Sequence, residues 1–189
     1  MATLPLTRRT ALLGGALAVG GVVAGGAGRA AASPATDVRI LNLVLQLEEL
    51  EAGFYGAALD RGVLRGELRE YAETVFSHER QHVEFLRDAL GAKAARKPQM
   101  RFGAAVTSEK RFVAAATSLE DTVVSAYNGQ AANLSSSALG AAARIVSVEA
   151  RHAAWIRAIA GKPPAVDATD PIATERQVRA AVKKLGFLR

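Results

Sequence analysis

Four segments of the chain repeat apolar residues at steps of three and four, a spacing that lines one face of an α-helix. They cover about 37–60, 67–90, 108–131 and 138–160, and glycine or proline follows most of them. The stripes run through Leu41, Leu45, Ala52 and Leu59; through Leu68, Ala72, Val75, Leu86 and Leu90; through Val113, Ala116, Val124 and Ala131; and through Ala138, Ala142, Ile145, Ile156 and Ile159. Four amphipathic helices of this length predict an all-α four-helix bundle over residues 37–161.

The connections between the segments differ in length. Residues 62–66 and the polar residues 130–137 form short links, whereas residues 92–107 contain Pro98 and Gly103 and cannot continue a helix. A link of that length can run along the whole bundle. The sequence therefore predicts a long crossover between the second and third helices.

The C-terminal extension, residues 162–189, carries one further helical pattern. Asp170 and Pro171 resemble an N-cap and a first helical residue, which predicts a short fifth helix to about Lys184. Packing against the bundle and joining a contact between copies of the chain are both open for this helix.

Acidic residues and histidines interrupt all four stripes at matching depth. Two passages repeat one order of groups, a lone glutamate, a tyrosine seven residues later, and then Glu-x-x-His. They comprise Glu48, Tyr55, Glu79 and His82 in the first half, and Glu120, Tyr127, Glu149 and His152 in the second. Glu49 and Glu51 fall off the first stripe and are expected in solvent, while His78 and Glu84 are expected to point away from the second.

Ionised carboxylates in an apolar core are costly unless they are paired or bind a metal. No basic residue lies on any stripe, and two divalent cations would balance four carboxylates. Oxygen-rich ligation with one imidazole per ion suits iron or manganese. Each Glu-x-x-His is then expected to serve one ion. Glu48 and Glu120 are expected as terminal ligands, and Glu79 and Glu149 as bridges between ions about 3.5–4 Å apart.

Composition narrows the chemistry further. The chain has no cysteine, which excludes disulfides, iron–sulfur clusters and thiol catalysis, and it has only three histidines. Half of its residues are apolar, which is enough for a sizeable core. The net charge is +6, but its basic residues are scattered without aromatic interleaving, so nucleic-acid binding is not expected.

Residues 1–35 have the order of a secretory signal: Arg8 and Arg9, then an Ala/Gly/Val stretch, then a small-residue exit. The paired arginines favour export through the twin-arginine route. Cleavage is expected after Ala32 or Ala35. Because the stretch is rich in glycine and interrupted by Arg29, a removable signal is favoured over a retained membrane anchor.

Residues 38–160 resemble the ferritin-like superfamily, which includes bacterioferritins and rubrerythrins, and the phrases around Glu48 and Glu149 are similar to exported ferritin-like domain proteins. The resemblance implies that Tyr55 and Tyr127 lie beside the metal centre. Two departures matter. Without cysteine the chain cannot hold the rubredoxin-type iron site of full rubrerythrins, and its fifth helix and signal differ from a typical cytoplasmic storage cage.

The leading functional hypothesis is two-electron chemistry at a pair of iron ions, which would oxidise Fe(II) or reduce peroxide or oxygen. A pair of manganese ions that disproportionates peroxide is one alternative. A structural or stress-protective helical protein without turnover is another. The expected partners are metal ions with oxygen or peroxide, and assembly into a homo-oligomer is left open.

Overall fold

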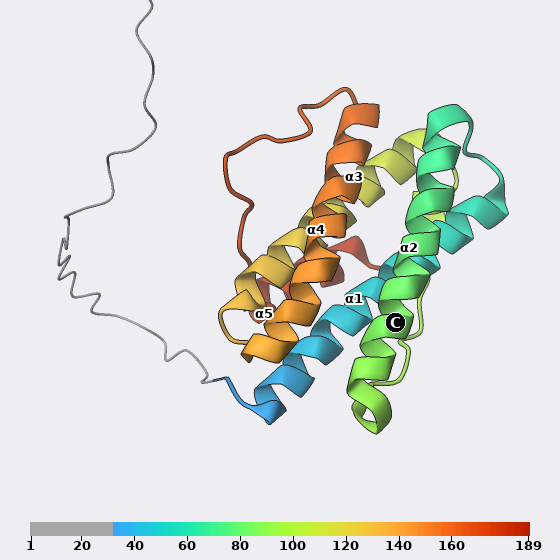
Figure 1. The fold of residues 1–189 in the computed structure, drawn as a ribbon. Helices are drawn as coiled ribbons and strands as arrows, with labels where there is room; N and C mark the ends of the chain where they lie inside the picture. The colour runs from blue at the N-terminus through green and yellow to red at the C-terminus, as the bar shows by residue number, and fades with distance from the viewer. Residues whose placement is uncertain (1–31) are drawn as a thin grey trace, which may run out of the picture.

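The computed structural model describes residues 32–189; the twin arginines and most of the expected signal lie outside them. The described chain forms five α-helices and two 3₁₀ turns (Figure 1). They are α1 (Pro34–Arg61), α2 (Gly66–Leu90), η1 (Gly91–Lys93), η2 (Gly103–Val106), α3 (Glu109–Ala131), α4 (Ser136–Ile159) and α5 (Glu175–Leu185). The predicted all-α architecture is confirmed.

The ends of the first helix follow local chemistry. Ser33 caps α1 by accepting a hydrogen bond from the backbone N–H of Thr36 at 3.1 Å, and Pro34 takes the first helical position. Gly62, at φ 62°, ends the helix in the left-handed conformation that glycine adopts without steric cost. Asp37 in the first turn accepts hydrogen bonds from the backbone N–H and hydroxyl of Ser135, which caps α4. The starts of α1 and α4 are thereby joined.

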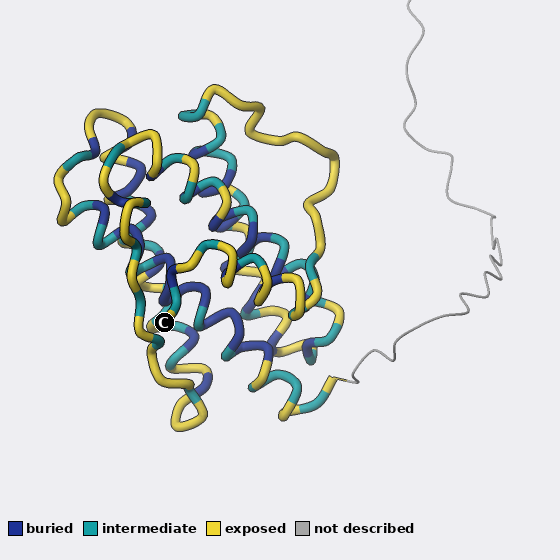
Figure 2. Tube along the Cα trace, turned by 180° about the vertical axis from the view of Figure 1, so that it is seen from behind, coloured by how far each residue is buried: buried dark blue, intermediate teal, exposed yellow. Residues whose placement is uncertain are grey.

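The helices pair within the halves of the chain, α1 along α2 and α3 along α4. The connection from η1 to η2 runs the length of the bundle, so α3 returns in the same direction as α2 (Figure 1). This is the predicted crossover. Figure 2 shows buried positions along the facing sides of the helices, while the connections are largely exposed.

An aromatic cluster attaches the crossover and the C-terminus to the bundle. Phe54 of α1 stacks on Phe112 at 5.1 Å and on Phe187 at 5.7 Å between ring centroids, and meets the edge of Phe102 at 5.8 Å. The backbone N–H of Arg101 donates to the carbonyl of Phe187 at 2.8 Å. The crossover and the tail therefore form one layer against α1 and α3.

The fifth helix begins later than the sequence predicts. Asp170 and Pro171 lie outside any helix, and α5 starts at Glu175 because Thr174 and Gln177 form a reciprocal capping box. The backbone N–H of Ala173 donates to the carbonyl of Ser125 at 2.9 Å, which holds the preceding segment on α3. The predicted start at Asp170 and Pro171 is therefore wrong.

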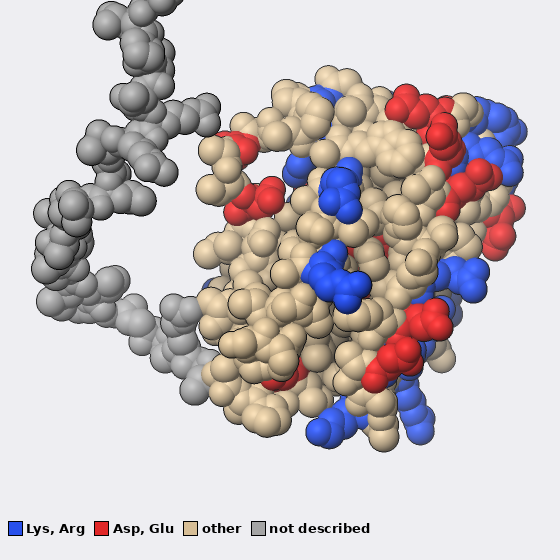
Figure 3. Space-filling view, in the orientation of Figure 1, with Lys and Arg blue, Asp and Glu red and all other residues tan. Residues whose placement is uncertain are grey.

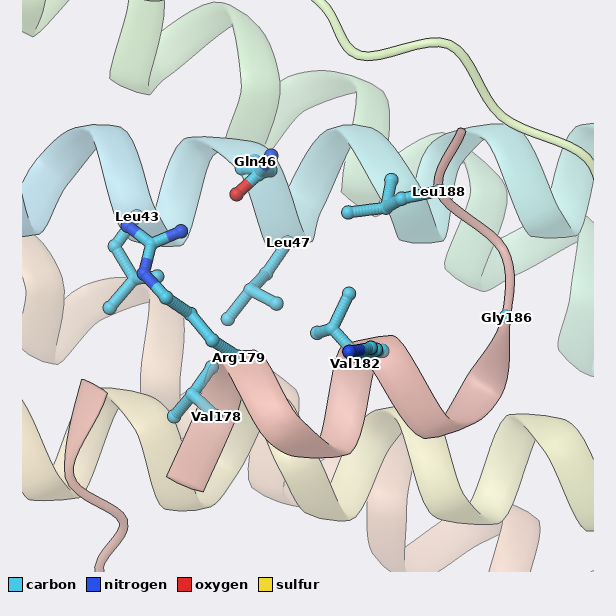
Figure 4. Close-up of a pocket in the computed structure, with 9 residues that line it drawn as sticks. Leu43, Gln46, Leu47, Val178, Arg179, Val182, Gly186 and Leu188 are labelled. Carbon is cyan, nitrogen blue, oxygen red and sulfur yellow. The ribbon is translucent and has the colours of Figure 1, made fainter. Parts of the chain in front are cut away.

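A pocket of about 220 Å³ lies between α1 and α5 (Figure 4). Its walls are mainly apolar, from Leu43 and Leu47 on one side and Val178 and Val182 on the other, with Arg179 at the rim. No carboxylate or histidine lines it.

None of the helices in residues 32–189 combines the length and the apolar character that a membrane span requires.

Two glutamates expected in solvent are buried. Glu49 and Glu51 are 2% and 0% exposed. Glu51 lies one turn after Glu48 and one turn before Tyr55, so it shares their inward face, whereas Glu49 lies beside Ala95 and Arg96 of the crossover. Glu49 is compensated by an ion pair with Arg87 of α2, a partner 38 residues away that helical periodicity could not indicate.

Candidate metal site

The six predicted ligands converge at mid-height of the bundle. Glu48 comes from α1, Glu79 and His82 from α2, Glu120 from α3, and Glu149 and His152 from α4. All four carboxylates are fully buried, and His152 is nearly so. His82 alone reaches the surface, with 12% of its side chain exposed.

One histidine nitrogen marks the first half of the site. Nδ1 of His82 lies 3.1 Å from Oε2 of Glu48, 3.3 Å from Oε2 of Glu79 and 2.8 Å from Oε1 of Glu149. Three of the four helices thus place a carboxylate oxygen against one imidazole. These four residues form a group that could hold a metal ion.

The other histidine marks the second half. Nδ1 of His152 lies 3.1 Å from Oε1 of Glu79, 3.4 Å from Oε2 of Glu149 and 3.8 Å from Oε2 of Glu120. Glu79 and Glu149 therefore send one oxygen to each histidine, while Glu48 and Glu120 each face one. This division has the form expected of bridging and terminal ligands, and the ligand roles themselves stay a prediction.

The donor atoms present fit metal binding. In the described chain, the buried atoms that lack a hydrogen-bond partner include Oε1 of Glu79, Oε2 of Glu120, both oxygens of Glu149 and Nδ1 of His152. These atoms lie close together without hydrogen-bond alignment. Two ligands about 2.1 Å from a common ion, at tetrahedral to octahedral angles, lie about 3.0–3.4 Å apart, close to the separations seen here.

Tyrosines hold the outer oxygens of the two terminal carboxylates. The hydroxyl of Tyr127 donates to Oε1 of Glu48 at 2.6 Å. Tyr55 donates to Oε1 of Glu120, and the hydroxyl of Tyr71 also lies 3.2 Å from that oxygen. Glu48 and Glu120 therefore each use one oxygen for tyrosine and turn the other toward a histidine. In both cases the tyrosine and the glutamate lie on different helices, one on α1 and the other on α3.

The sequence was compared with models of known protein families. The model of the ferritin-like domain family matches residues 36–162, which covers α1 to α4 and ends just beyond α4. The chain belongs to the ferritin-like domain family. A search of curated proteins finds no match to it. The predicted superfamily is thus confirmed, with a buried Glu/His cluster in its core that could hold metal.

The sequence analysis missed a residue behind His152 of the ferritin-like domain. Nδ1 of His78 lies 2.9 Å from Nε2 of His152, and the rings stack with centroids 5.2 Å apart. His78 was expected to point away from the site, and that was wrong. The signal was present in the sequence, because His78 and His82 are four residues apart and so share a helical face.

Tyr71 was missed as well. It is fully buried, and its hydroxyl lies 2.9 Å from that of Tyr55, so the two tyrosines form a pair on Glu120. Tyr71 lies three residues after Leu68 and four before Val75, which places it on the second stripe. Its position was readable, but its long-range partner was not.

Burial and mutual repulsion set the protonation of the metal-free site. Burial raises the pKa of Glu48 and of Glu120 well above the usual value, and the charge of Glu149 raises both further. Burial opposes the charge on Glu79 too, but hydrogen bonds from His152 and His82 lower its pKa to about 2. Although burial disfavours their cations, carboxylate neighbours raise the pKa of His82 to about 12 and that of His152 to about 10.

A surface pocket of about 320 Å³ borders the exposed edge of His82. Gln81 and Phe85 of α2 line it with Arg144 and Ile145 of α4, and the guanidinium of Arg144 lies 5.7 Å from the Phe85 ring centroid. Figure 3, which views α2 and α4 from outside, shows charges of both signs over the α2 side, and basic side chains set in otherwise uncharged surface over α4. The pocket thus borders the one predicted ligand that reaches the surface.

Proposed function

We propose that this ferritin-like domain binds two iron ions and uses them to oxidise Fe(II) or to reduce peroxide or oxygen. The observation that carries the proposal is the division of Glu79 and Glu149, each with one oxygen toward His82 and the other toward His152. One mononuclear site would not need two carboxylates that span both histidines.

The donor set supports this choice of metal. Four carboxylates and two imidazoles, with no thiolate, give each ion an oxygen-rich shell with one nitrogen, which suits iron or manganese. Burial, and after it the charge of Glu149, raises the pKa of Glu48 and Glu120; two divalent ions would cancel the charge of four carboxylates and so favour their ionised forms.

Two iron ions, when bound, supply two electrons to an oxidant and accept them from Fe(II). The chain holds its carboxylates in place for that chemistry. Tyr127 fixes Glu48, and the pair of Tyr55 and Tyr71 fixes Glu120. Fe(II), as substrate, or a small oxidant would arrive through the pocket beside His82. The other predicted ligands are buried and so are shielded from water.

Export through the twin-arginine route is part of the proposal. Cleavage after Ala32 would leave Ser33 at the start of the mature chain, where it caps α1, whereas cleavage after Ala35 would remove both the cap and Pro34. Helix stability therefore favours Ala32. Mass spectrometry of protein recovered outside the cytoplasm tests this, and a chain that keeps residues 1–32 or begins at Thr36 would contradict it.

Turnover is tested on natively expressed protein. Metal content is measured first, and Fe(II) is then added under air while oxygen uptake and the rise of Fe(III) absorbance are followed. We expect oxidation well above the rate in buffer, and its loss in Glu79→Gln. Native manganese with oxygen release from peroxide would instead identify a catalase-like enzyme, and full metal occupancy without either activity a structural protein. Either result overturns the proposal.

A further inference from the structure

Glu51 is a buried carboxylate that the six-residue site does not use. Its side chain is fully buried, and neither oxygen has a hydrogen-bond partner. Among residues 32–189, seven buried side-chain atoms lack such a partner; five belong to residues of the candidate metal site, and the other two are the oxygens of Glu51. Metal binding, which would satisfy the first five atoms, could therefore satisfy the oxygens of Glu51 as well.

The neighbouring Glu49 shows how this chain treats a buried carboxylate with a structural role. Glu49 is almost as buried, but Arg87 donates to its Oε1. Glu51 has no cation or hydroxyl of that kind. An ionised carboxylate without one is costly in an apolar core, so Glu51 is protonated in the metal-free chain and would be compensated by a metal ion once ionised.

The position of Glu51 on α1 directs it to one half of the site. It lies one turn after Glu48 and one turn before Tyr55, whose hydroxyl donates to Glu120. Burial raises the pKa of Glu51, and Glu120 is the charged neighbour that raises it most, ahead of Glu79. Its place one turn before Tyr55, which bonds Glu120, favours the half of the site that contains Glu120 and His152.

Each histidine faces three carboxylates, but the ligand atoms of the half at His152 gather less closely. Glu48, Glu79, His82 and Glu149 bring four ligand atoms within 4.8 Å of one another, whereas the second such group contains only Glu120, Glu149 and His152. Glu51 belongs to neither group, so its carboxylate would have to change rotamer to reach an ion. Because neither oxygen makes a hydrogen bond, that change would not break one.

We propose that Glu51 is a seventh protein ligand, for the metal ion held by Glu120 and His152. This rests on the proposed dinuclear site and makes its two positions inequivalent. It also raises the carboxylates from four to five, one more than two divalent ions balance. The position beside Glu120 would therefore prefer the more highly charged ion.

Co(II) is a suitable probe, because its visible absorption reports the number and kind of its ligands. Anaerobic titrations would compare the full ferritin-like domain with Glu51→Gln, which keeps the shape of the side chain, and with Glu49→Gln as the matched buried control. Calorimetry would give the affinity of each equivalent, and circular dichroism would verify that each variant is folded.

The wild type is expected to bind two Co(II) ions. Glu51→Gln should weaken one equivalent at least tenfold and change its absorption, and leave the other equivalent unchanged; Glu49→Gln should match the wild type. Two equivalents within twofold of wild type in Glu51→Gln overturn the seventh ligand and leave the dinuclear site standing. Equal weakening in both variants overturns it too, since the loss of a buried charge then suffices. Fewer than two ions in the wild type would overturn both proposals.

Discussion

Nδ1 of His78 lies 2.9 Å from Nε2 of His152, so the two imidazoles share a hydrogen bond at the nitrogen of His152 that faces away from the carboxylates. The contact turns Nδ1 of His152 toward Glu79, Glu120 and Glu149. Groups that hold the outer nitrogen of a ligating histidine fix both its ring orientation and its tautomer. His78 is only partly buried, so it also connects this half of the site with the surface.

Replacement of His78 should weaken one of the two metal positions. We expect His78→Ala to reduce the affinity of one equivalent about 10- to 100-fold, because His152 loses the group that orients it. Glu84→Ala, an exposed change on the same helix, is the control. Stepwise Co(II) titration measures the effect. Unchanged affinity for both equivalents would show that the contact between the two histidines has no part in binding.

The tyrosines should differ in their contribution to stability. Tyr127 alone bonds Oε1 of Glu48, so Tyr127→Phe should lower the free energy of unfolding of the metal-free domain by about 1–3 kcal/mol. Tyr71→Phe should cost less, because Tyr55 still donates to Glu120. Urea denaturation of the two variants tests the order. A larger loss in Tyr71→Phe would contradict this account of how the carboxylates are held.

Helical periodicity brought the predicted ligands together but did not predict their surroundings. It placed Glu48 and Glu149 on inward faces because a bundle core repeats along each helix, and that repeat is local. Glu51 and His78 also stand three or four residues from predicted ligands, so their inward positions could have been predicted, but the contact of His78 with His152, 74 residues away, could not. The late start of α5 has the same origin, since the segment before it is held on α3 through Ala173.

The metal-free domain should lose stability as the pH rises, and the metal-bound domain should not. Burial raises the pKa of Glu48 and Glu120, and carboxylate neighbours raise that of His152 to about 10. The folded state therefore holds more protons than the unfolded state from about pH 4.5 upward, and unfolding free energy falls with pH there. Glu79, with a pKa of about 2, has the opposite effect only below that range.

Thermal melts of metal-free protein between pH 5 and 9 measure this change. Metal binding should also release protons, since ligands must lose them, so apparent affinity should rise with pH. A titration in weak buffer with a pH indicator detects the release. A melting temperature that rises with pH in the metal-free protein would contradict the assigned protonation.

Two glycines provide a matched test of the fold. A Cβ on Gly129 of α3 would lie 1.9 Å from the carbonyl oxygen of Ala173, whereas nothing lies within 4 Å of one on Gly140 of α4. Gly129→Ala should therefore destabilise the domain by about 3 kcal/mol or more. Gly140→Ala should stabilise it by about 0.5–1 kcal/mol. Calorimetric unfolding of both variants measures the difference, and equal stabilities would place the segment before α5 elsewhere.

The number of iron ions bound per chain tests the central claim most directly. Native mass spectrometry after anaerobic loading with Fe(II) should give two ions for the wild type. It should give one for Glu120→Gln and fewer than one for Glu149→Gln, because Glu149 faces both histidines whereas Glu120 faces one. A wild-type chain that binds one ion or none, or a Glu149→Gln variant that keeps two, would contradict a site bridged by Glu79 and Glu149.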